Sequence, residues 1–333
     1  MQNIHLVNTQ AVMPVVRFLQ GINAPVYQLL EEANFPVEVL EGKHRIIATY
    51  SWWKLMQVAY DYSEDQALGF HISESSNLAG LSVFIDDVLP IAQSAHDGIC
   101  LLLDYLATIS SHAAFMLTHQ WHGSWFIAQS QSHFIDGLVP MQQAVFADML
   151  KFVQLFVGSN WQPELINVQH KDSHNVFNRY FPEASITDNS KNLGFFIPNE
   201  KLGRISDEVE RYIDASKQQK IIPPTFKSNL RYALMPYGKE KLPQLVDVPT
   251  KVGLPVRTIQ RYLANENTSF KEVIQQMRFD LAIDSLLNSD DKIIDIATML
   301  GYKNPSNFAR AFKEWTGLTP KQYRKHKAAN LQS

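Results

Sequence analysis

A group of polar side chains near the C-terminus has the residue types that bind base edges in DNA. The group consists of Asn304, Ser306, Asn307 and Arg310. In the major groove, Arg can donate two hydrogen bonds to guanine, and the Asn amide can pair with adenine in the same bidentate way. The same residues would also suit the solvent-exposed face of an ordinary helix with an Asn cap. The flanking sequence decides between these interpretations, because base reading requires a helix supported by a second helix.

The flanking sequence predicts such a pair of helices. Gly301 is a left-handed stop, and before it apolar residues recur at helical spacing, namely Ile293, Ile296, Ala297 and Leu300. Asn304 and Pro305 then supply a cap and a first-turn proline for a second helix, which buries Phe308, Phe312 and Trp315. We therefore predict a helix–turn–helix motif whose second helix, 305–315, carries the polar group.

A related pattern lies earlier in the chain, with helices expected at 245–253 and 254–263. The second of these carries further base-reading candidates, Arg257, Gln260 and Arg261. Between the two motifs, a capping box from Ser269 to Glu272 begins an amphipathic segment that predicts one long helix, 270–288. We expect this helix to hold the two recognition helices, 256–264 and 305–315, about one turn of DNA apart, roughly 34 Å.

The charge distribution agrees with DNA contact at this end of the chain. Residues 242–333 hold 13 Lys and Arg against 9 Asp and Glu, a net charge of +4, whereas the whole chain has −3. Residues 55–150 contain no Lys or Arg and ten Asp and Glu. Cations at phosphates supply much of the affinity for DNA and position the protein without reading sequence. The phosphate-contact candidates are Lys303, Lys313, Lys321 and Arg324.

These strings resemble the AraC/XylS transcriptional regulators. The resemblance is carried by RTIQRYLANENTSFKEVIQQMRFDLA at 257–282 and by IIDIATMLGYKNPSNFARAFKEWTGLTPKQYR at 293–324, which follows the family signature nearly residue for residue. The first motif departs from the pattern, with Pro249 where a small helical residue is usual and Pro255 where a Ser usually caps the recognition helix. An interior proline costs a helix about 3 kcal/mol, and a lost side-chain cap costs about 1 kcal/mol. We expect the first motif to be shortened or distorted.

The N-terminal part predicts an α+β domain. Helical patterns fill the chain to Ile109, followed by a β-hairpin at 113–121 and 125–132 and a long helix at 141–157. Short strands are expected at 165–170, 185–188 and 192–197. We therefore expect an α+β sensor domain followed by an all-α domain with two helix–turn–helix motifs joined by a linker helix. The expected boundaries are 1–235, including a helical connector at 206–235, and 236–333.

Residues 20–205 resemble the arabinose-binding-type N-terminal domain of some AraC-family regulators. The likeness is carried by LLEEANFPVEVL, DQALGFHI and NLAGLSVF. It implies a domain that senses a ligand or contacts a partner, and it does not name the ligand. Four tryptophans are candidates for lining an effector pocket, although aromatic residues at such spacings are more often plain core: Trp52, Trp53, Trp121 and Trp125.

Composition argues against other classes of protein. A single cysteine, Cys100, excludes an internal disulfide framework. An enzyme with a fused regulator domain, such as an alkyl-transfer repair protein, is a further alternative, but its chemistry needs several reactive or zinc-bound cysteines, and the single Cys100 argues against it. The histidines around the hairpin, His112, His119, His122 and His133, lack the spacing of a metal site, so no metal and no cofactor is expected. Hydrolase, nucleotide-binding and dinucleotide-binding motifs are absent. Because these motifs are absent, we expect that the protein is not an enzyme. No membrane-length apolar run and no signal-peptide pattern occur, so we expect a cytoplasmic protein.

The sequence predicts a bacterial regulator, more often an activator in this family, that binds double-stranded promoter DNA. RNA polymerase is an expected partner, and a homodimer is plausible. Control by a small-molecule effector in the N-terminal domain is the favoured hypothesis. The alternative is control by a protein partner or by oligomerisation. A filled N-terminal core would favour the alternative, and an enclosed cavity with one or two polar groups would favour a ligand sensor.

Overall fold

A computed structural model gives the structure of the chain. It describes residues 4–40, 42, 46–76, 78, 81–109, 113–130, 138–204, 206, 209, 225–238 and 242–330. The chain divides into two compact units, one of residues 5–223 and the other of residues 224–333 together with 1–4. Within the described ranges, every helix is too short or too polar to span a lipid bilayer.

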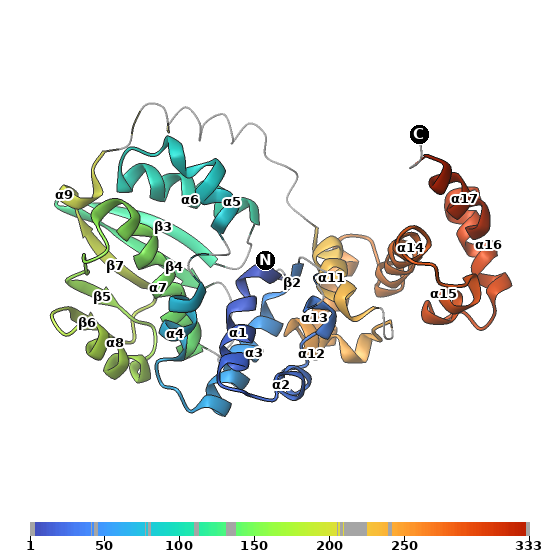
Figure 1. The fold of residues 1–333 in the computed structure, drawn as a ribbon, viewed down its shortest axis with the longest axis horizontal. Coiled ribbons are helices and arrows are strands. Elements are labelled where there is room, and N and C mark those ends of the chain that lie inside the picture. Colours follow the sequence, from blue (N-terminus) through green and yellow to red (C-terminus); the bar gives the residue numbers. More distant parts are fainter. Residues whose placement is uncertain are drawn as a thin grey trace. The chain divides into compact units, whose positions relative to one another are not determined.

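The first unit has the expected α+β composition (Figure 1). Its early helices are α1 (Met13–Gly21), α2 (Val26–Glu32), α3 (Thr49–Ser63), α4 (Leu68–Ser76), α5 (Ser82–Asp87) and α6 (Ala95–Ile109). The later helices are α7 (Leu138–Val157), α8 (His174–Tyr180) and α9 (Asn199–Leu202). A short antiparallel pair that the periodicity did not predict joins β1 (Leu6–Asn8) to β2 (Ile46–Ala48). The pairing of β1 with β2 joins segments about 40 residues apart, which periodicity within either segment does not indicate.

The main sheet has five strands in the order β3-β4-β7-β5-β6. The strands are β3 (Ala113–Gln120), β4 (Gly123–Ser130), β5 (Leu165–Asn167), β6 (Ser185–Thr187) and β7 (Leu193–Pro198). The expected hairpin is β3–β4, and its turn is Trp121-His122 rather than the expected 122–124. Pairing is antiparallel except between β5 and β6, which are parallel. The predicted strands therefore belong to a single sheet.

Helix α7 lies at the centre of this unit, because it contributes to both of its apolar cores. Phe146, Phe152 and Val153 belong to the core beneath the sheet, and Met141 and Ala144 belong to the core of the helices α1–α4. Gln143 fastens α4 to α7, since its Oε1 accepts from the Gly69 backbone N–H at 3.0 Å and its Nε2 donates to the Gln66 carbonyl at 2.7 Å. Both polar atoms of this wholly buried amide thus have hydrogen-bond partners, and these bonds position the two helices.

The second unit is helical. It contains α11 (Phe226–Leu234), α12 (Pro249–Val252), α13 (Val256–Asn265), α14 (Phe270–Asn288), α15 (Ile293–Met299), α16 (Pro305–Thr316) and α17 (Pro320–Asn330). Helix α11 packs against α14, α12 and α13. The boundary expected near residue 236 would separate α11 from these partners, whereas the compact unit begins at Pro224. Most of the expected connector before α11 lies outside the described residues.

The close approach of α4 to α7 generates a stability prediction. A Cβ at Gly69 would lie 2.0 Å from the Pro140 carbonyl oxygen and 2.5 Å from the Gln143 Cβ. Gly69→Ala must therefore push two helices apart, and we expect it to lower the free energy of unfolding by about 1–3 kcal/mol or more. Urea unfolding followed by tryptophan fluorescence measures this.

Gly21→Ala is the matched control, because a Cβ there meets nothing within 4 Å. We expect it to be neutral or slightly stabilising, by roughly 0.4–1 kcal/mol. Equal stability of the two variants would contradict the packing of α4 on α7.

Candidate functional site

The second helix–turn–helix motif is built as the sequence predicts. Gly301 ends α15 with a φ of +77°, a left-handed conformation in which a side chain would be strained. The N-cap of α16 is Asn304, whose Oδ1 accepts from the Asn307 backbone N–H at 2.9 Å, and Pro305 is in the first turn. The two helices share a core made by Ile296, Ala297, Leu300, Phe308 and Phe312.

This packing leaves the polar face of α16 exposed. Phe308 and Phe312 are fully buried, so the opposite side of the helix faces solvent. That side carries Ser306, Arg310 and Lys313 at intervals of four and three, with Asn307 beside them, and all four are exposed. Asn304 is also exposed, but its Oδ1 serves as the helix cap, which leaves its amide nitrogen as the group available for a base edge.

The first motif is shortened, as expected from its prolines. Its first helix consists of a 3₁₀ turn at Leu245–Asp247 followed by the four-residue α12, which begins at Pro249. Pro249 therefore occupies the first helical position, where its missing N–H costs nothing. Pro255 stands at the N-cap of α13 and offers no side-chain acceptor. Despite this, α13 is a ten-residue helix, and it exposes Arg257, Gln260 and Arg261 opposite the buried Ile259 and Leu263.

Polar contacts lock the first motif to the helices α11 and α14. Glu266, just after α13, accepts from the backbone N–H groups of Phe226 and Lys227 at 2.6 and 2.9 Å, so it caps α11. Arg231 of α11 forms an ion pair with Asp280 of α14. An acceptor at a helix N-terminus satisfies donors that would otherwise lack partners. The recognition helix α13 is thereby fixed to its support.

The linker helix α14 begins at the expected cap. The Ser269 hydroxyl accepts from the Glu272 backbone N–H at 3.4 Å. Hydrogen bonds from the hydroxyls of Thr268 and Ser269 to the Glu272 carboxylate lower the pKa of this carboxyl. Further along α14, Arg278 Nε donates to the Leu300 carbonyl at 3.2 Å, which ties α14 to the turn of the second motif. Both motifs are therefore attached to one helix.

The phosphate-contact candidates differ in their surroundings. Lys303, Lys313 and Lys321 are exposed. Arg324 is half-buried, and its Nε donates to the Leu286 carbonyl at 3.3 Å, near the C-terminal end of α14. Its guanidinium thus helps to hold α17 on α14, and because Nη2 is buried, any phosphate contact must use Nη1.

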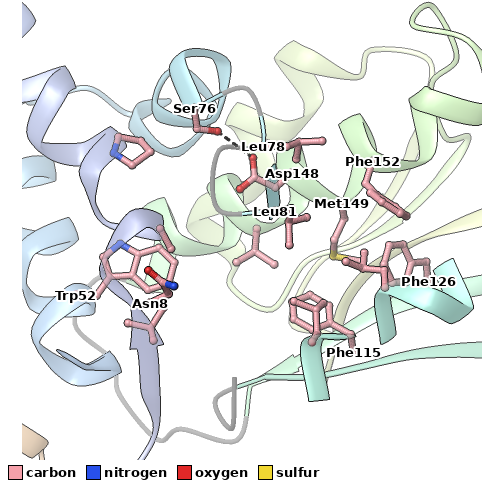
Figure 2. Close-up of a pocket in the computed structure, with 16 residues that line it drawn as sticks. Asn8, Trp52, Ser76, Leu78, Leu81, Phe115, Phe126, Asp148, Met149 and Phe152 are labelled. Atoms are coloured by element: carbon pink, nitrogen blue, oxygen red, sulfur yellow. Dashed lines mark hydrogen bonds between the residues drawn. The ribbon is translucent and has the colours of Figure 1, made fainter. Parts of the chain in front are cut away.

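The first unit contains a cavity of about 190 Å³ with a largely apolar wall (Figure 2). Trp52 and Asn8 lie on one side, and Phe115, Phe126 and Phe152 lie on the other. Asp148 and Ser76 also line it. For scale, a cavity of about 150 Å³ with an apolar lining can bind benzene. The space is therefore sufficient for a small organic molecule.

Asp148 is the unexpected residue of this cavity. Burial on α7 raises the pKa of its carboxyl from 3.8 to about 6, against the opposing effects of Ser73, Lys151 and Ser76. Its Oδ1 accepts from the Ser73 hydroxyl at 2.5 Å and the Ser76 hydroxyl at 3.5 Å. The signal in the sequence was a single acid within the apolar helical run MQQAVFADMLKFVQLFV. Perturbed carboxyls beside cavities are candidates for functional sites.

Of the four tryptophan candidates, one lines this cavity and three lie elsewhere in the unit. Trp52 lines the cavity. Trp53, its neighbour on α3, points into the helical core and is 3% exposed. Trp121 lies in the hairpin turn and is 88% exposed, while Trp125 packs its ring against Phe196 on the sheet. Trp52 and Trp53 are neighbours on α3, but Trp52 faces the cavity and Trp53 faces the helical core.

The histidines around the hairpin do not converge on a metal site in the described part of the chain. Among those residues, no group of three or more His, Cys, Asp or Glu side chains could hold a metal ion. His119 instead bonds to the Ser124 hydroxyl at 2.8 Å, and His122 packs on Trp121. His112 and His133 lie outside the described residues.

Comparison with known proteins supports the assignment of the second unit. Residues 250–326 match a family model described as a helix-turn-helix domain. The virulence regulon transcriptional activator VirF of Shigella flexneri is 30% identical over 122 residues, which are 37% of this chain and 45% of VirF. An uncharacterized HTH-type transcriptional regulator of Mycobacterium tuberculosis is 37% identical over 81 residues, 24% of each chain. The chain thus spans less than half the length of these relatives.

Among solved structures, the transcriptional regulator CdpR from Pseudomonas aeruginosa aligns with 95% of this chain and 98% of its own, at 16% identity and a TM-score of 0.40. The matched sequences coincide with α12–α17, which hold both motifs and the linker helix. Residues 250–326 therefore form an AraC-type helix–turn–helix domain, and the relatives matched there are transcriptional regulators.

The buried carboxyl of Asp148 generates a prediction about stability and pH. Because its pKa is about 6 in the folded unit and near 3.8 when unfolded, the folded state holds the proton more tightly. The contribution of Asp148 to the free energy of unfolding is therefore zero below about pH 3.8. It becomes unfavourable as the pH rises from about 3.8 towards 6, and it stays unfavourable above pH 6. The difference between the two pKa values corresponds to about 3 kcal/mol.

Asp148→Asn should remove this cost while retaining the acceptor for Ser73 and Ser76. We expect the variant to be more stable than the parent by up to about 3 kcal/mol at pH 7.5, and to differ little at pH 4. Urea unfolding followed by tryptophan fluorescence reports mainly on this unit, because Trp315 alone of the six tryptophans lies outside it. A variant that is less stable at pH 7.5 would contradict the assigned burial.

Proposed function

We propose that this protein is a bacterial transcriptional regulator that binds promoter DNA through α13 and α16 and responds to a small molecule bound in its N-terminal unit. The observation that carries the DNA-binding role is a pair of helices that expose Arg, Asn, Gln and Ser side chains. The opposite face of each helix is apolar and buried. Helices so presented enter successive major-groove faces in helix–turn–helix proteins.

Within this proposal, the described residues divide into two roles. Base reading belongs to Arg257, Gln260 and Arg261 on α13, and to Asn304, Ser306, Asn307 and Arg310 at α16. Phosphate contact belongs to Lys303, Lys313, Lys321 and the outer N–H groups of Arg324. The first unit acts as the sensor domain, and the second unit, which includes α11, acts as the DNA-binding domain. The place of action is the bacterial cytoplasm, where the promoter DNA is.

Control by a ligand is supported by the cavity in the first unit. An apolar cavity with one carboxyl and one or two further polar groups has the character of a ligand site rather than of a filled core. We infer that ligand binding shifts the population of states that differ in DNA affinity or in contact with RNA polymerase. Activation and a homodimeric state are the arrangements that we propose from the family. Control by a protein partner or by oligomerisation alone is the alternative. The finding that no small molecule binds in the cavity would favour it.

Replacing Arg310 tests base reading by α16. Arg310→Ala should cost about 1–3 kcal/mol in binding to the preferred site and relax the preference at one base position, because a bidentate contact is lost. Binding titrations on the preferred site and its single-base variants measure both effects.

Arg17→Ala removes an exposed arginine from α1 of the other unit and is the matched control, with unchanged binding expected. If Arg310→Ala binds every variant site with the original preference, Arg310 does not read a base.

Replacing Lys321 tests the phosphate role. Lys321→Ala should weaken binding to all DNA sequences by a similar factor and reduce the slope of log affinity against log salt by about one, because one phosphate contact is lost. Titrations between 50 and 200 mM salt measure the slope. Lys171→Ala, an exposed lysine in the first unit, should leave the slope unchanged. A loss confined to the preferred sequence would show that Lys321 contacts bases.

A further inference from the structure

The cavity of the first unit has a specific electrostatic character. Of the described residues that line it, Asp148 alone is ionisable. The remaining wall is dominated by Leu, Val, Met and four aromatic side chains, Trp52, Phe115, Phe126 and Phe152. The cation nearest in sequence is Lys151, which acts electrostatically on Asp148 but is not among the lining residues. A ligand in this cavity therefore meets a largely apolar surface, one acid and the neutral polar groups of Asn8 and Ser76.

The hydrogen bonds around Asp148 leave the acid able to accept from a ligand. The bonds from Ser73 and Ser76 go to the same oxygen, Oδ1. The nearby Lys151 Nζ donates to the Ser73 carbonyl, which holds this ammonium on the backbone of α4. Protein atoms surround most of the Asp148 side chain, but part of it remains accessible. Because this side chain lines the cavity, its accessible part faces the cavity.

A carboxylate in such a wall is costly unless it is paired. Burying a charge away from water carries a large penalty, which a hydrogen-bonded opposite charge offsets. The two hydroxyl donors carry no charge, and the Lys151 ammonium is bonded to the Ser73 carbonyl, so together they offset only part of this penalty and the pKa of Asp148 stays raised. A cationic donor at the accessible part of Asp148 would complete the pairing, and aromatic faces nearby would also attract a cation.

We propose that this cavity binds a small organic ammonium ion, a protonated amine on an aromatic or branched alkyl body. The ammonium lies at Asp148 near Ser76, and the body packs against Phe115, Phe126 and Met149. The role of this organic ammonium ion as an effector rests on the proposed function, whereas its binding to the cavity does not. A carboxylic acid of the same shape is repelled by Asp148, and a neutral alcohol leaves the charge unpaired.

Three probes of similar size separate these cases by calorimetry on the full-length chain at pH 7.5 and fixed salt. They are benzylamine, benzyl alcohol and benzoate, whose ring matches the scale of the cavity. We expect benzylamine to bind at least about tenfold more tightly than benzyl alcohol, and benzoate to bind most weakly. Equal or tighter binding of benzyl alcohol or benzoate would overturn the proposed ligand class.

Two variants and one control locate the binding site. Asp148→Asn should reduce benzylamine affinity to that of benzyl alcohol and leave the alcohol's affinity unchanged. Val145→Trp should fill the cavity and abolish binding of both probes, because Val145 lines the wall. Asp61→Asn removes an exposed acid of α3 and should change neither. Full benzylamine affinity in Asp148→Asn or in Val145→Trp would overturn the proposed site.

The pH dependence gives an independent readout. The groups that face Asp148 are the hydroxyls of Ser73 and Ser76 from α4 and the ammonium of Lys151 from α7, which Glu74 in turn influences. Burial raises the pKa of Asp148 to about 6, so benzylamine affinity should be constant above pH 7 and fall about tenfold per pH unit below 6. A flat profile from pH 5 to 8 would contradict a carboxylate partner.

A DNA-binding titration with saturating benzylamine separates this inference from the proposed function. Calorimetric binding that changes DNA affinity supports both. Calorimetric binding with unchanged DNA affinity supports the ligand class and contradicts effector control by such amines. DNA binding without any calorimetric binding of benzylamine overturns the ligand class and leaves the regulator intact.

Discussion

The second unit depends on the rigidity of α14, the helix that joins the two motifs. At 19 residues it is about 28 Å long, close to one turn of DNA. Leu281, Ala282 and Leu286 belong to the core of the second motif. On the first-motif side, the ion pair between Asp280 and Arg231 joins α14 to α11, which Glu266 caps. Because the second motif packs on α14 and the first motif is joined to α14 through α11, the spacing of α13 and α16 is set by covalent geometry and packing.

Strong local signals made most of the second unit predictable from sequence. Gly253 and Gly301 mark turns, and both have positive φ in the structure. The predicted helices 270–288 and 305–315 agree with α14 and α16 to within a residue. The prolines of the first motif were also informative, since a ring at Pro249 permits a helix to begin there but not to continue through it. Long-range contacts were not predictable, and Glu266 capping α11 is an example, because nothing local to either segment announces that bond.

The first unit was predictable in class and less so in detail. The hairpin and α7 follow from periodicity, whereas the strand order β3-β4-β7-β5-β6 depends on contacts between distant segments. The cavity shows the same limit. Aromatic content drew attention to four tryptophans, yet one of them, Trp52, lines the space. The informative residue was an acid at an apolar position, because a buried carboxylate that costs stability indicates a requirement other than folding. Whether Asp148 faced a cavity or a paired core residue could not be read from the sequence.

The central claim is that α13 and α16 read DNA together at a spacing fixed by α14. Hydroxyl-radical and base-methylation footprinting of the full-length protein on its preferred genomic site, at fixed salt, tests this most directly. The account predicts two protected major-groove segments whose centres lie about 10–10.5 base pairs apart on one face of the duplex. A single protected segment would show that the shortened first motif does not engage DNA. Salt-sensitive protection with no preferred site would contradict sequence-specific reading altogether.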